Sequence, residues 1–248
     1  MKYIILGIIQ GLTEFLPVSS SGHLVLAQRI LGIDTQQLMV ILTCHLGTLF
    51  SLILFFFKDI IRVFKNLKLL GYILLVTLIT GFIGIMGKNF FESLFTSVKA
   101  VSISLFITGL ILILTKKFLE GKRDINSLNL KDASLLGLAQ AVAIIPGISR
   151  SGMTISCLLF RKIDRETAFR FSFLAGIPAI LGAFLLEIKD ITLSSSIQFQ
   201  SLLLSFIFSF LSGLLALGIL RAIINKAKLH YFGYYCLLVA ILSLIFLK

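Results

Sequence analysis

Residues able to bind a phosphorylated group, or to act on it, are concentrated in two short stretches of an otherwise apolar chain. The first, QGLTEFLPVSSSGH at residues 10–23, contains an amide, a carboxylate, three serine hydroxyls and an imidazole, from Gln10, Glu14, Ser19, Ser20, Ser21 and His23. The second, PGISRSGMT at residues 146–154, carries an arginine among hydroxyls, namely Ser149, Arg150, Ser151 and Thr154. Guanidinium N–H groups match phosphate oxygens in pairs, hydroxyls donate hydrogen bonds, and glycine lets backbone N–H groups approach an oxyanion. The second stretch therefore predicts a site for a phosphate-like anion.

The composition places both stretches in a membrane protein. Of the 248 residues, 58% are hydrophobic and only 14% are charged, whereas about a quarter of the residues of a soluble protein are charged. The net charge of +12 is also found in nucleic-acid-binding proteins, but most of the 23 basic residues lie in short loops between apolar runs. This distribution predicts membrane topology and no nucleic-acid partner.

Six apolar runs approach the length of about 20 residues that a helix needs to span a bilayer. They cover residues 38–57, 69–87, 100–115, 171–187, 201–220 and 232–247, and we expect loops between them, among them 58–68 and 88–99. Two further apolar regions, 1–31 and 133–160, are interrupted by proline, glycine and serine, so that each half is too short to span. Interrupted segments of this kind indicate re-entrant helix pairs that line a protein cavity. We therefore predict an all-α integral membrane protein with six full transmembrane helices and two re-entrant helix hairpins.

The two interrupted regions resemble each other when the sequence is shifted by 130 residues. The shift places Gly7, Gln10, Ser19, Ser21 and Gly22 on Gly137, Gln140, Ser149, Ser151 and Gly152. Three predicted spans follow each region, and cytoplasmic placement of the basic loops orients the two sets of spans in opposite directions. We predict a single multi-pass domain of the cell membrane over residues 1–248, with inverted halves at about 1–120 and 130–248.

The helix expected over residues 1–16 has one small, polar face. It is formed by Gly7, Gln10, Gly11 and Glu14. Glycines allow another backbone to approach, so we expect the amide and the carboxylate to face a cleft. A carboxylate at membrane depth costs roughly 3 kcal/mol, which favours a functional role; the alternative is a packing face whose glutamate pairs with a buried base. The second region has Ile144 in the place of the acid, so one region would supply the carboxylate and the other the arginine.

Several roles are open for these side chains. The serines and His23 could provide a nucleophile or a proton relay beside Glu14, or His23 could be a packing residue. Glu14 could also hold a divalent cation against phosphate oxygens. Arg150 could be a snorkelling loop residue, but it follows a short apolar run that leaves it in the bilayer core. Because the sequence has no P-loop, nucleotide hydrolysis is not indicated, and a phosphate site inside a membrane predicts a substrate with a lipid tail.

Both polar stretches resemble the signature motifs of the undecaprenyl-diphosphate phosphatases, the bacitracin-resistance proteins of bacteria. HLGTL at residues 45–49 and DRETAFRFSFLAGIPAILGA at 164–183 look similar to that family too, so the resemblance covers nearly the whole chain. It implies an integral-membrane phosphatase that hydrolyses undecaprenyl diphosphate to undecaprenyl phosphate and phosphate, recycling the lipid carrier of cell-wall synthesis and conferring bacitracin resistance. It also implies a divalent cation, Mg²⁺ or Ca²⁺, a fold similar to inverted-repeat transporters, and a homodimer.

The resemblance carries over to individual residues. It implies that the catalytic residues are Glu14, Ser20, His23 and Arg150, with Glu14 also associated with the metal. We expect the phosphate-binding residues to be Gln10, Ser19, Ser21, Ser149, Ser151 and Thr154. Gln10 stands where many members have a second glutamate, which puts in doubt any mechanism that needs two carboxylates on the metal.

Two questions stay open at the level of sequence. The nucleophile could be Ser20, His23 or a water molecule activated by His23. A transporter or flippase for a polyprenyl phosphate lipid would also have inverted repeats and polar groups near the membrane midplane. A purely structural membrane protein would explain neither Glu14 nor Arg150.

Overall fold

The computed structural model describes residues 2–31, 38–117, 121–188 and 198–247. Within these ranges the regular structure is helical, apart from an isolated bridge between Arg123 and Ile163. The α-helices are α1 (Lys2–Phe15), α2 (Ser20–Leu31), α3 (Leu38–Phe55), α4 (Phe57–Phe64), α5 (Leu67–Met86), α6 (Lys88–Phe95), α7 (Val98–Leu114), α8 (Leu130–Val142), α9 (Arg150–Phe160), α10 (Arg165–Glu187), α11 (Phe199–Asn225) and α12 (His230–Phe246). Two short 3-10 turns, Thr115–Lys117 and Ile125–Ser127, lie between α7 and α8.

Long apolar helices make the chain a multi-pass membrane protein. In the described ranges, α5, α7 with the turn after it, α10 and α11 are each long and apolar enough to cross a membrane. Helices α3 and α4 qualify only as a pair that bends by 72°, and α12 is an apolar helix of 17 residues. Large apolar side chains such as Leu78, Phe82 and Leu215 are exposed on these helices, as a lipid-facing surface requires. Each of the six apolar runs predicted from the sequence lies on an apolar helix. That all six cross the membrane completely remains a prediction.

The structure differs from the predicted span at 38–57 and the predicted loop at 58–68. The chain bends at Phe56 and continues as the amphipathic helix α4. Two contacts hold α4 against the rest of the molecule: Val63 is buried in the main core, and Arg170 of α10 donates a hydrogen bond to Asp59 at 3.0 Å. These tertiary contacts hold an amphipathic helix where the sequence predicted a loop. The segment at 88–99, also expected to be a loop, contains α6.

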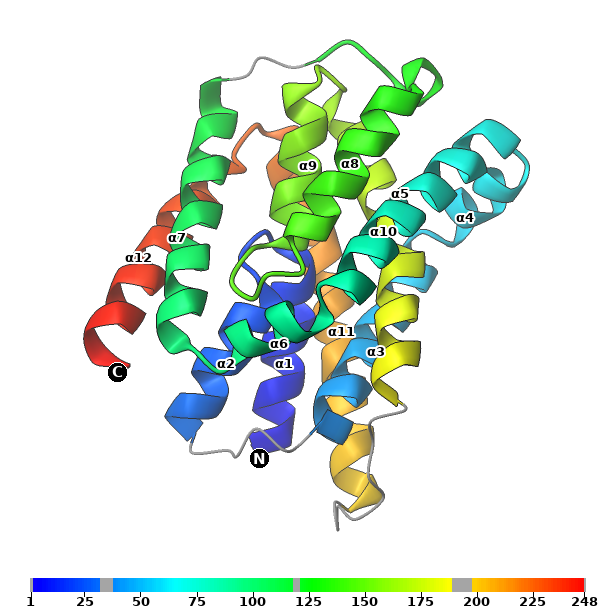
Figure 1. Ribbon diagram of the computed structural model, residues 1–248. Coiled ribbons are helices and arrows are strands. Elements are labelled where there is room, and N and C mark those ends of the chain that lie inside the picture. The colour runs from blue at the N-terminus through cyan, green and yellow to red at the C-terminus, as the bar shows by residue number, and fades with distance from the viewer. Residues whose placement is uncertain (1, 32–37, 118–120, 189–197, 248) are drawn as a thin grey trace.

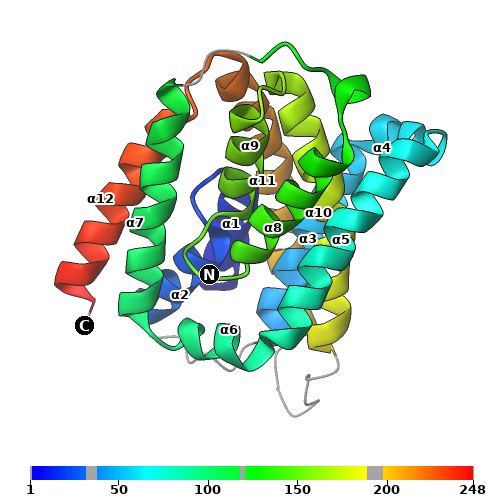
Figure 2. The same cartoon turned by 45° about the horizontal axis from the view of Figure 1, so that its top comes forward.

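Both interrupted regions fold as predicted, each into two short helices. The first hairpin, α1 and α2, breaks at residues 16–19, and the second, α8 and α9, breaks at residues 143–149. Pro17 and Pro146 lie in the breaks, where proline disfavours helical backbone in the residue before it. The two breaks meet near the middle of the molecule, with α8 and α9 on one side and α1 and α2 on the other (Figure 1). Helix α1 packs along α11, α8 packs along α5, and α7 lies beside α12 in both views (Figure 2).

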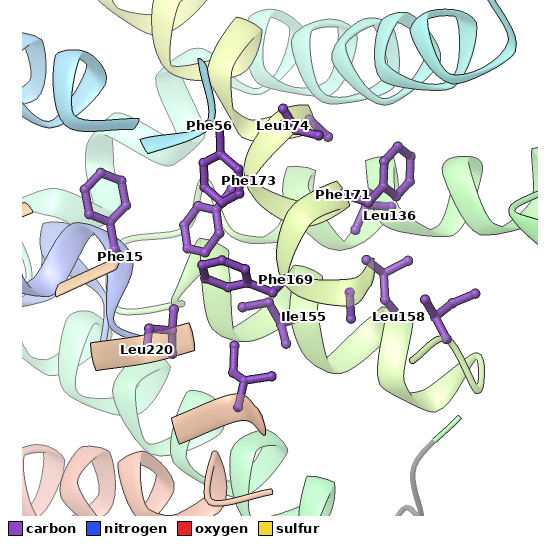
Figure 3. Packing of buried hydrophobic residues seen from close by; sticks show 14 of the residues in the cluster. Phe15, Phe56, Leu136, Ile155, Leu158, Phe169, Phe171, Phe173, Leu174 and Leu220 are labelled. Carbon is purple, nitrogen blue, oxygen red and sulfur yellow. The ribbon is translucent and has the colours of Figure 1, made fainter. Parts of the chain in front are cut away.

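A cluster of aromatic side chains forms the core beside these breaks (Figure 3). The ring of Phe173 on α10 lies 5.7 Å from that of Phe15 on α1, 5.9 Å from Phe56 and 5.1 Å from Phe169. Such aromatic pairs add roughly 0.5–1.5 kcal/mol each beyond the area that they bury. The cluster therefore fixes the end of α1 relative to α10, and with it the residue next to Phe15, which is Glu14.

An ion-pair clasp ties the start of α8 to the end of α9. Asp132 is fully buried and accepts hydrogen bonds from Arg123 Nη2 at 2.5 Å and from Arg161 Nε at 2.9 Å. Asp132 also forms a capping box with Asn129 at the first turn of α8. Burial alone would raise the pKa of the Asp132 carboxyl, but the hydrogen bonds from Arg123, Arg161 and the Asn129 backbone lower that pKa below its ordinary value. The carboxylate thus stays ionised and holds the second hairpin together at its base.

Candidate active site

Glu14 is the centre of a hydrogen-bonded cluster that both hairpins build. The side chain is nearly buried, and its Oε1 accepts a hydrogen bond from Arg150 Nη2 at 2.6 Å. Its Oε2 accepts hydrogen bonds from Ser20 Oγ at 2.6 Å and from Gln10 Nε2 at 3.0 Å. The ion pair of Glu14 with Arg150 joins residues 136 positions apart in the sequence. The predicted meeting of the carboxylate of one region with the arginine of the other is confirmed.

The glycine face of α1 places Glu14 at this depth. A Cβ atom added to Gly7 would lie 2.6 Å from the backbone oxygen of Ser205, and one added to Gly11 would lie 2.5 Å from that of Ser209, both on α11. Because real Cβ atoms do not approach so closely, only glycine lets the two helices pack at this distance. The face therefore binds α11 as predicted, while Gln10 on the same helix reaches toward α3 and Glu14 toward α9.

Arg150, the first residue of α9, is held from two sides. Its guanidinium lies 5.8 Å from the ring centroid of Phe173 and against Gly176, where a side chain would collide with Nη1. Nη2 donates to Glu14, whereas Nη1 is buried and has no hydrogen-bond partner within the described residues. A buried N–H group without an acceptor costs free energy, so Nη1 is the position at which an anionic ligand would gain most.

The serines of both stretches form the same arrangement at the starts of α2 and α9. Ser149 Oγ accepts a hydrogen bond from the Gly152 N–H at 3.1 Å and pairs with Ser151 Oγ at 3.3 Å. In the first hairpin, Ser19 Oγ accepts from the Gly22 N–H at 3.3 Å and pairs with Ser21 Oγ at 3.2 Å. Helix N-termini carry partial positive charge. Two of them, together with Arg150, therefore make the region between the hairpins favourable for an anion.

Two predicted site residues contact groups other than Glu14. His23 Nδ1 lies 2.8 Å from the Ser19 carbonyl oxygen and His23 Nε2 lies 2.8 Å from the Tyr235 hydroxyl of α12, with the two rings stacked. Thr154 is fully buried, donates to the Arg150 carbonyl at 2.7 Å and pairs with Ser172 Oγ of α10 at 2.5 Å. In this geometry His23 is directed toward α12, and Thr154 joins α9 to α10. Their roles at the site stay predictions.

Comparison with known proteins identifies the family. Residues 3–242 match the family described as bacitracin resistance protein BacA. The chain belongs to this family. An undecaprenyl-diphosphatase of Halothermothrix orenii is 45% identical over 98% of this chain and 96% of that protein. Proteins of the same name from Alkaliphilus metalliredigens, at 42% over 99% and 98%, and Methanobrevibacter smithii, at 39% over 98% and 95%, are also similar.

The structure of this BacA-family member adds two residues to which the sequence analysis gave no role, although His45 begins the family-like stretch HLGTL. His45 on α3 lies with Nδ1 2.9 Å from Gln10 Nε2 and 3.9 Å from Glu14 Oε2. Its signal in the sequence was a lone histidine inside the apolar run at 38–57. Tyr235 gave no such signal, because its contact with His23 depends on how α12 packs against the first hairpin.

The residues of this BacA-family site restrict how a metal ion could bind. Among the described residues, no group of three or more histidine, cysteine, aspartate or glutamate side chains is placed to hold a metal ion. Glu14 is the carboxylate of the cluster, and protein donors already contact both of its oxygens. Mg²⁺ commonly binds through one or two carboxylates together with phosphate oxygens of the substrate. Glu14 therefore offers a single carboxylate, and a cation bound here would take most of its ligands from the substrate and water.

Proposed function

We propose that this chain is an undecaprenyl-diphosphatase, which hydrolyses undecaprenyl diphosphate to undecaprenyl phosphate and inorganic phosphate. This activity would recycle the lipid carrier of cell-wall synthesis and confer resistance to bacitracin. The observation that carries the proposal is the Glu14–Arg150 pair between the hairpins, in a chain whose relatives bear the name of this enzyme. No relative described above is named as a transporter, and we propose no second function.

Arg150 would hold the terminal phosphate. Its Nη1 is buried without a partner, so a phosphate oxygen can take that N–H while Nη2 continues to donate to Glu14. The hydroxyls and N-termini of α2 and α9 would supply further donors and partial positive charge. Donors fixed in advance by the protein stabilise the charge that develops on phosphate oxygens during transfer.

Ser20 has the geometry of an activated nucleophile. Its hydroxyl donates to Glu14 Oε2 at 2.6 Å, which is the arrangement of a nucleophile with its general base. Ser20 Oγ would attack the terminal phosphorus, its proton would pass to Glu14, and the bond from phosphorus to the bridging oxygen would break to release undecaprenyl phosphate. Water would then hydrolyse the phosphoserine and restore the Ser20 hydroxyl. His23, directed toward Tyr235, or a water molecule remain the alternative nucleophiles.

A divalent cation, Mg²⁺ or Ca²⁺, is part of the proposal. Glu14 would be its protein ligand, and the diphosphate oxygens would complete its shell. The cation would neutralise the negative charge of the diphosphate when bound. Gln10, as an amide beside Glu14, contributes no second negative charge to such a site.

The membrane arrangement is proposed on the same basis. The two hairpins would re-enter the membrane, with six spanning helices around them, in one domain of two inverted halves placed in the cell membrane. Support comes from the matching contacts of α1 with α11 and of α8 with α5. The homodimer implied by the resemblance stays a prediction, which the molar mass of the detergent-solubilised protein would test.

Release of inorganic phosphate tests the proposed function directly. Purified full-length protein in detergent should release phosphate from undecaprenyl diphosphate, and a chelator should stop the release. A trapped phospho-enzyme that is stable in acid would support Ser20, an acid-labile one would support His23, and none would favour water. Phosphate release no higher than that of an empty-vector preparation would overturn the proposal.

A further inference from the structure

We infer that His45 is a further substrate-binding residue, whose Nε2–H group donates a hydrogen bond to an oxygen of the diphosphate. The substrate in this inference rests on the proposed function. The position of the proton on the ring is independent of the proposed function, because it follows from three side chains that contact one another. These are Glu14, Gln10 and His45.

Glu14 fixes the orientation of the Gln10 amide. The carboxylate is paired with Arg150 at 2.6 Å, and an ionised carboxylate only accepts hydrogen bonds. The end of the Gln10 amide that lies 3.0 Å from Glu14 Oε2 must therefore be the NH₂ group. A flipped amide would place its oxygen against the carboxylate, which the ion pair forbids.

The Gln10 amide in turn fixes the tautomer of His45. Its Nε2 lies 2.9 Å from His45 Nδ1, and an amide NH₂ group only donates hydrogen bonds. His45 Nδ1 must therefore be the acceptor, and the proton of the neutral ring is on Nε2. One hydrogen of the NH₂ group is thus given to Glu14 and the other to His45.

The Nε2–H group of His45 is available to a ligand. Of the side chain, 28% is exposed. Within the described residues, the contacts of the His45 ring are made by Nδ1, and Nε2 is not one of the buried polar atoms without a partner. Nε2 is therefore open to solvent. Two donors are therefore open to an anion with several oxygens: Nη1 of Arg150, whose Nη2 pairs with Glu14, and Nε2 of His45, whose Nδ1 lies 3.9 Å from Glu14 Oε2.

This arrangement gives a reason for glutamine at position 10. A glutamate there would accept a hydrogen bond from His45 Nδ1–H instead of donating one. It would move the proton of the neutral ring away from Nε2, or convert the ring to an imidazolium, and it would place a second carboxylate against Glu14. By donating to His45 Nδ1, Gln10 directs the Nε2–H group of the ring to the substrate.

The tautomer can be measured on the whole protein without turnover. The chain has three histidines, so ¹⁵N-histidine labelling gives few signals, and His45→Gln identifies that of His45. We expect the proton on Nε2 in the unaltered protein and its loss from Nε2, or a doubly protonated ring, in Gln10→Glu. Adding inorganic phosphate should shift the His45 Nε2 signal and leave that of His230 unchanged. A proton on Nδ1, or no shift with phosphate at saturation, would overturn the inference.

Kinetics then separate this inference from the proposed function. Loss of one donor to a charged ligand should lower kcat/KM for undecaprenyl diphosphate about 10- to 100-fold in His45→Ala. Glutamine can place an N–H group near the former Nε2, so His45→Gln should recover part of the loss, whereas the shorter His45→Asn should not. His230→Gln is the matched control and should release phosphate at the unaltered rate. An active protein with an unimpaired His45→Ala variant refutes the role of His45; an inactive unaltered protein with the expected phosphate shift refutes the proposed function instead.

Discussion

The two hairpins share their backbone geometry but differ in the side chains that face the site. At the starts of α2 and α9, Ser19 and Ser149 cap the helix through the same hydrogen bond, to the N–H group three residues on. The acid at position 14 corresponds to Ile144, and Ser20 corresponds to Arg150 under the 130-residue shift. Both Ser20 and Arg150 contact Glu14, one at each carboxylate oxygen.

This difference shows how the molecule makes a site from two similar elements. The shared caps place two helix N-termini at the same region, which favours an anion without distinguishing one hairpin from the other. Two positions distinguish them: Glu14 corresponds to Ile144, and Ser20 corresponds to Arg150. In the proposed reaction, the first hairpin would supply the nucleophile and its base, and the second would supply the guanidinium that binds the phosphate.

The strongest test of this asymmetry places glutamine at position 14 and, separately, at the matching position 144. Glu14→Gln removes the base and the partner of Arg150, and we expect phosphate release to fall about 1,000-fold or more, as for loss of a catalytic group and a buried pair together. Ile144→Gln, the matched change in the second hairpin, should leave release within about twofold, because the apolar side chain of Ile144 donates no hydrogen bond and carries no charge in the Glu14 cluster. Equal losses in both variants would contradict the assignment of the acid to one hairpin.

The clasp at the base of the second hairpin predicts a pH dependence of stability. Since the folded-state pKa of Asp132 is lowered, its stabilisation is present above the ordinary aspartate pKa, about 3.9, and is lost as the pH falls through the folded value. Asp132→Asn should cost about 3 kcal/mol at neutral pH by leaving Arg123 and Arg161 without their carboxylate. Thermal unfolding in detergent should show that the variant loses less stability than the unaltered protein between pH 5 and pH 3. The same acid-induced loss in both would show that the clasp is not the titrating group.

Gly147 in the second break packs against α7 and against Gly22 of α2, and a side chain should be tolerated less at Gly147 than at Gly22. Gly147 has a φ angle of +93°, and a Cβ atom there would lie 2.7 Å from that of Ser104. Gly147→Ala should therefore destabilise the protein by about 2 kcal/mol or more. Gly22→Ala places a Cβ atom 3.1 Å from the Cα of Gly147 and should cost about 1 kcal/mol. Melting temperatures of the two variants in the same detergent provide the measurement, and the reverse order would contradict this packing.

The smallest expected effect distinguishes the two serine caps. Ser19 has a φ angle of +68°, whereas Ser149 has a φ angle of −79°. Glycine adopts a positive φ angle without strain, so Ser19→Gly should regain part of the roughly 1 kcal/mol lost with the cap. Ser149→Gly has no strain to relieve and should be the less stable variant by a few tenths to 1 kcal/mol. Chemical unfolding at equilibrium measures the difference, and a more stable Ser149→Gly variant would contradict it.

The sequence was sufficient to predict the features that depend on local patterns. The breaks follow from Pro17 and Pro146, and the approach of α1 to α11 follows from glycines spaced by one helical turn at positions 7 and 11. The similarity of the two regions, with Ile144 in the place of the acid, indicated that one hairpin supplies the carboxylate and the other the arginine, and the structure adds their direct contact. These predictions needed no knowledge of which helices are neighbours.

Features that depend on tertiary packing could not be read from the sequence. His45 enters the cluster because α3 packs beside α1, and His23 turns toward Tyr235 because α12 lies against the first hairpin. The bend at Phe56 likewise depends on contacts of α4 with α10, made by Asp59 and Arg170. In each case the same residues in another arrangement of helices would have had other partners.

The central claim is that Arg150 of one hairpin and Glu14 of the other form a single phosphate site. Phosphate release from undecaprenyl diphosphate by the unaltered protein and by Arg150→Ala, measured side by side in detergent with matched melting curves, tests it most directly. We predict release by the unaltered protein and a loss of about 100- to 1,000-fold in the folded variant, the cost in rate of removing one preorganised donor to the reacting group. A folded Arg150→Ala variant that releases phosphate at the unaltered rate would contradict the account.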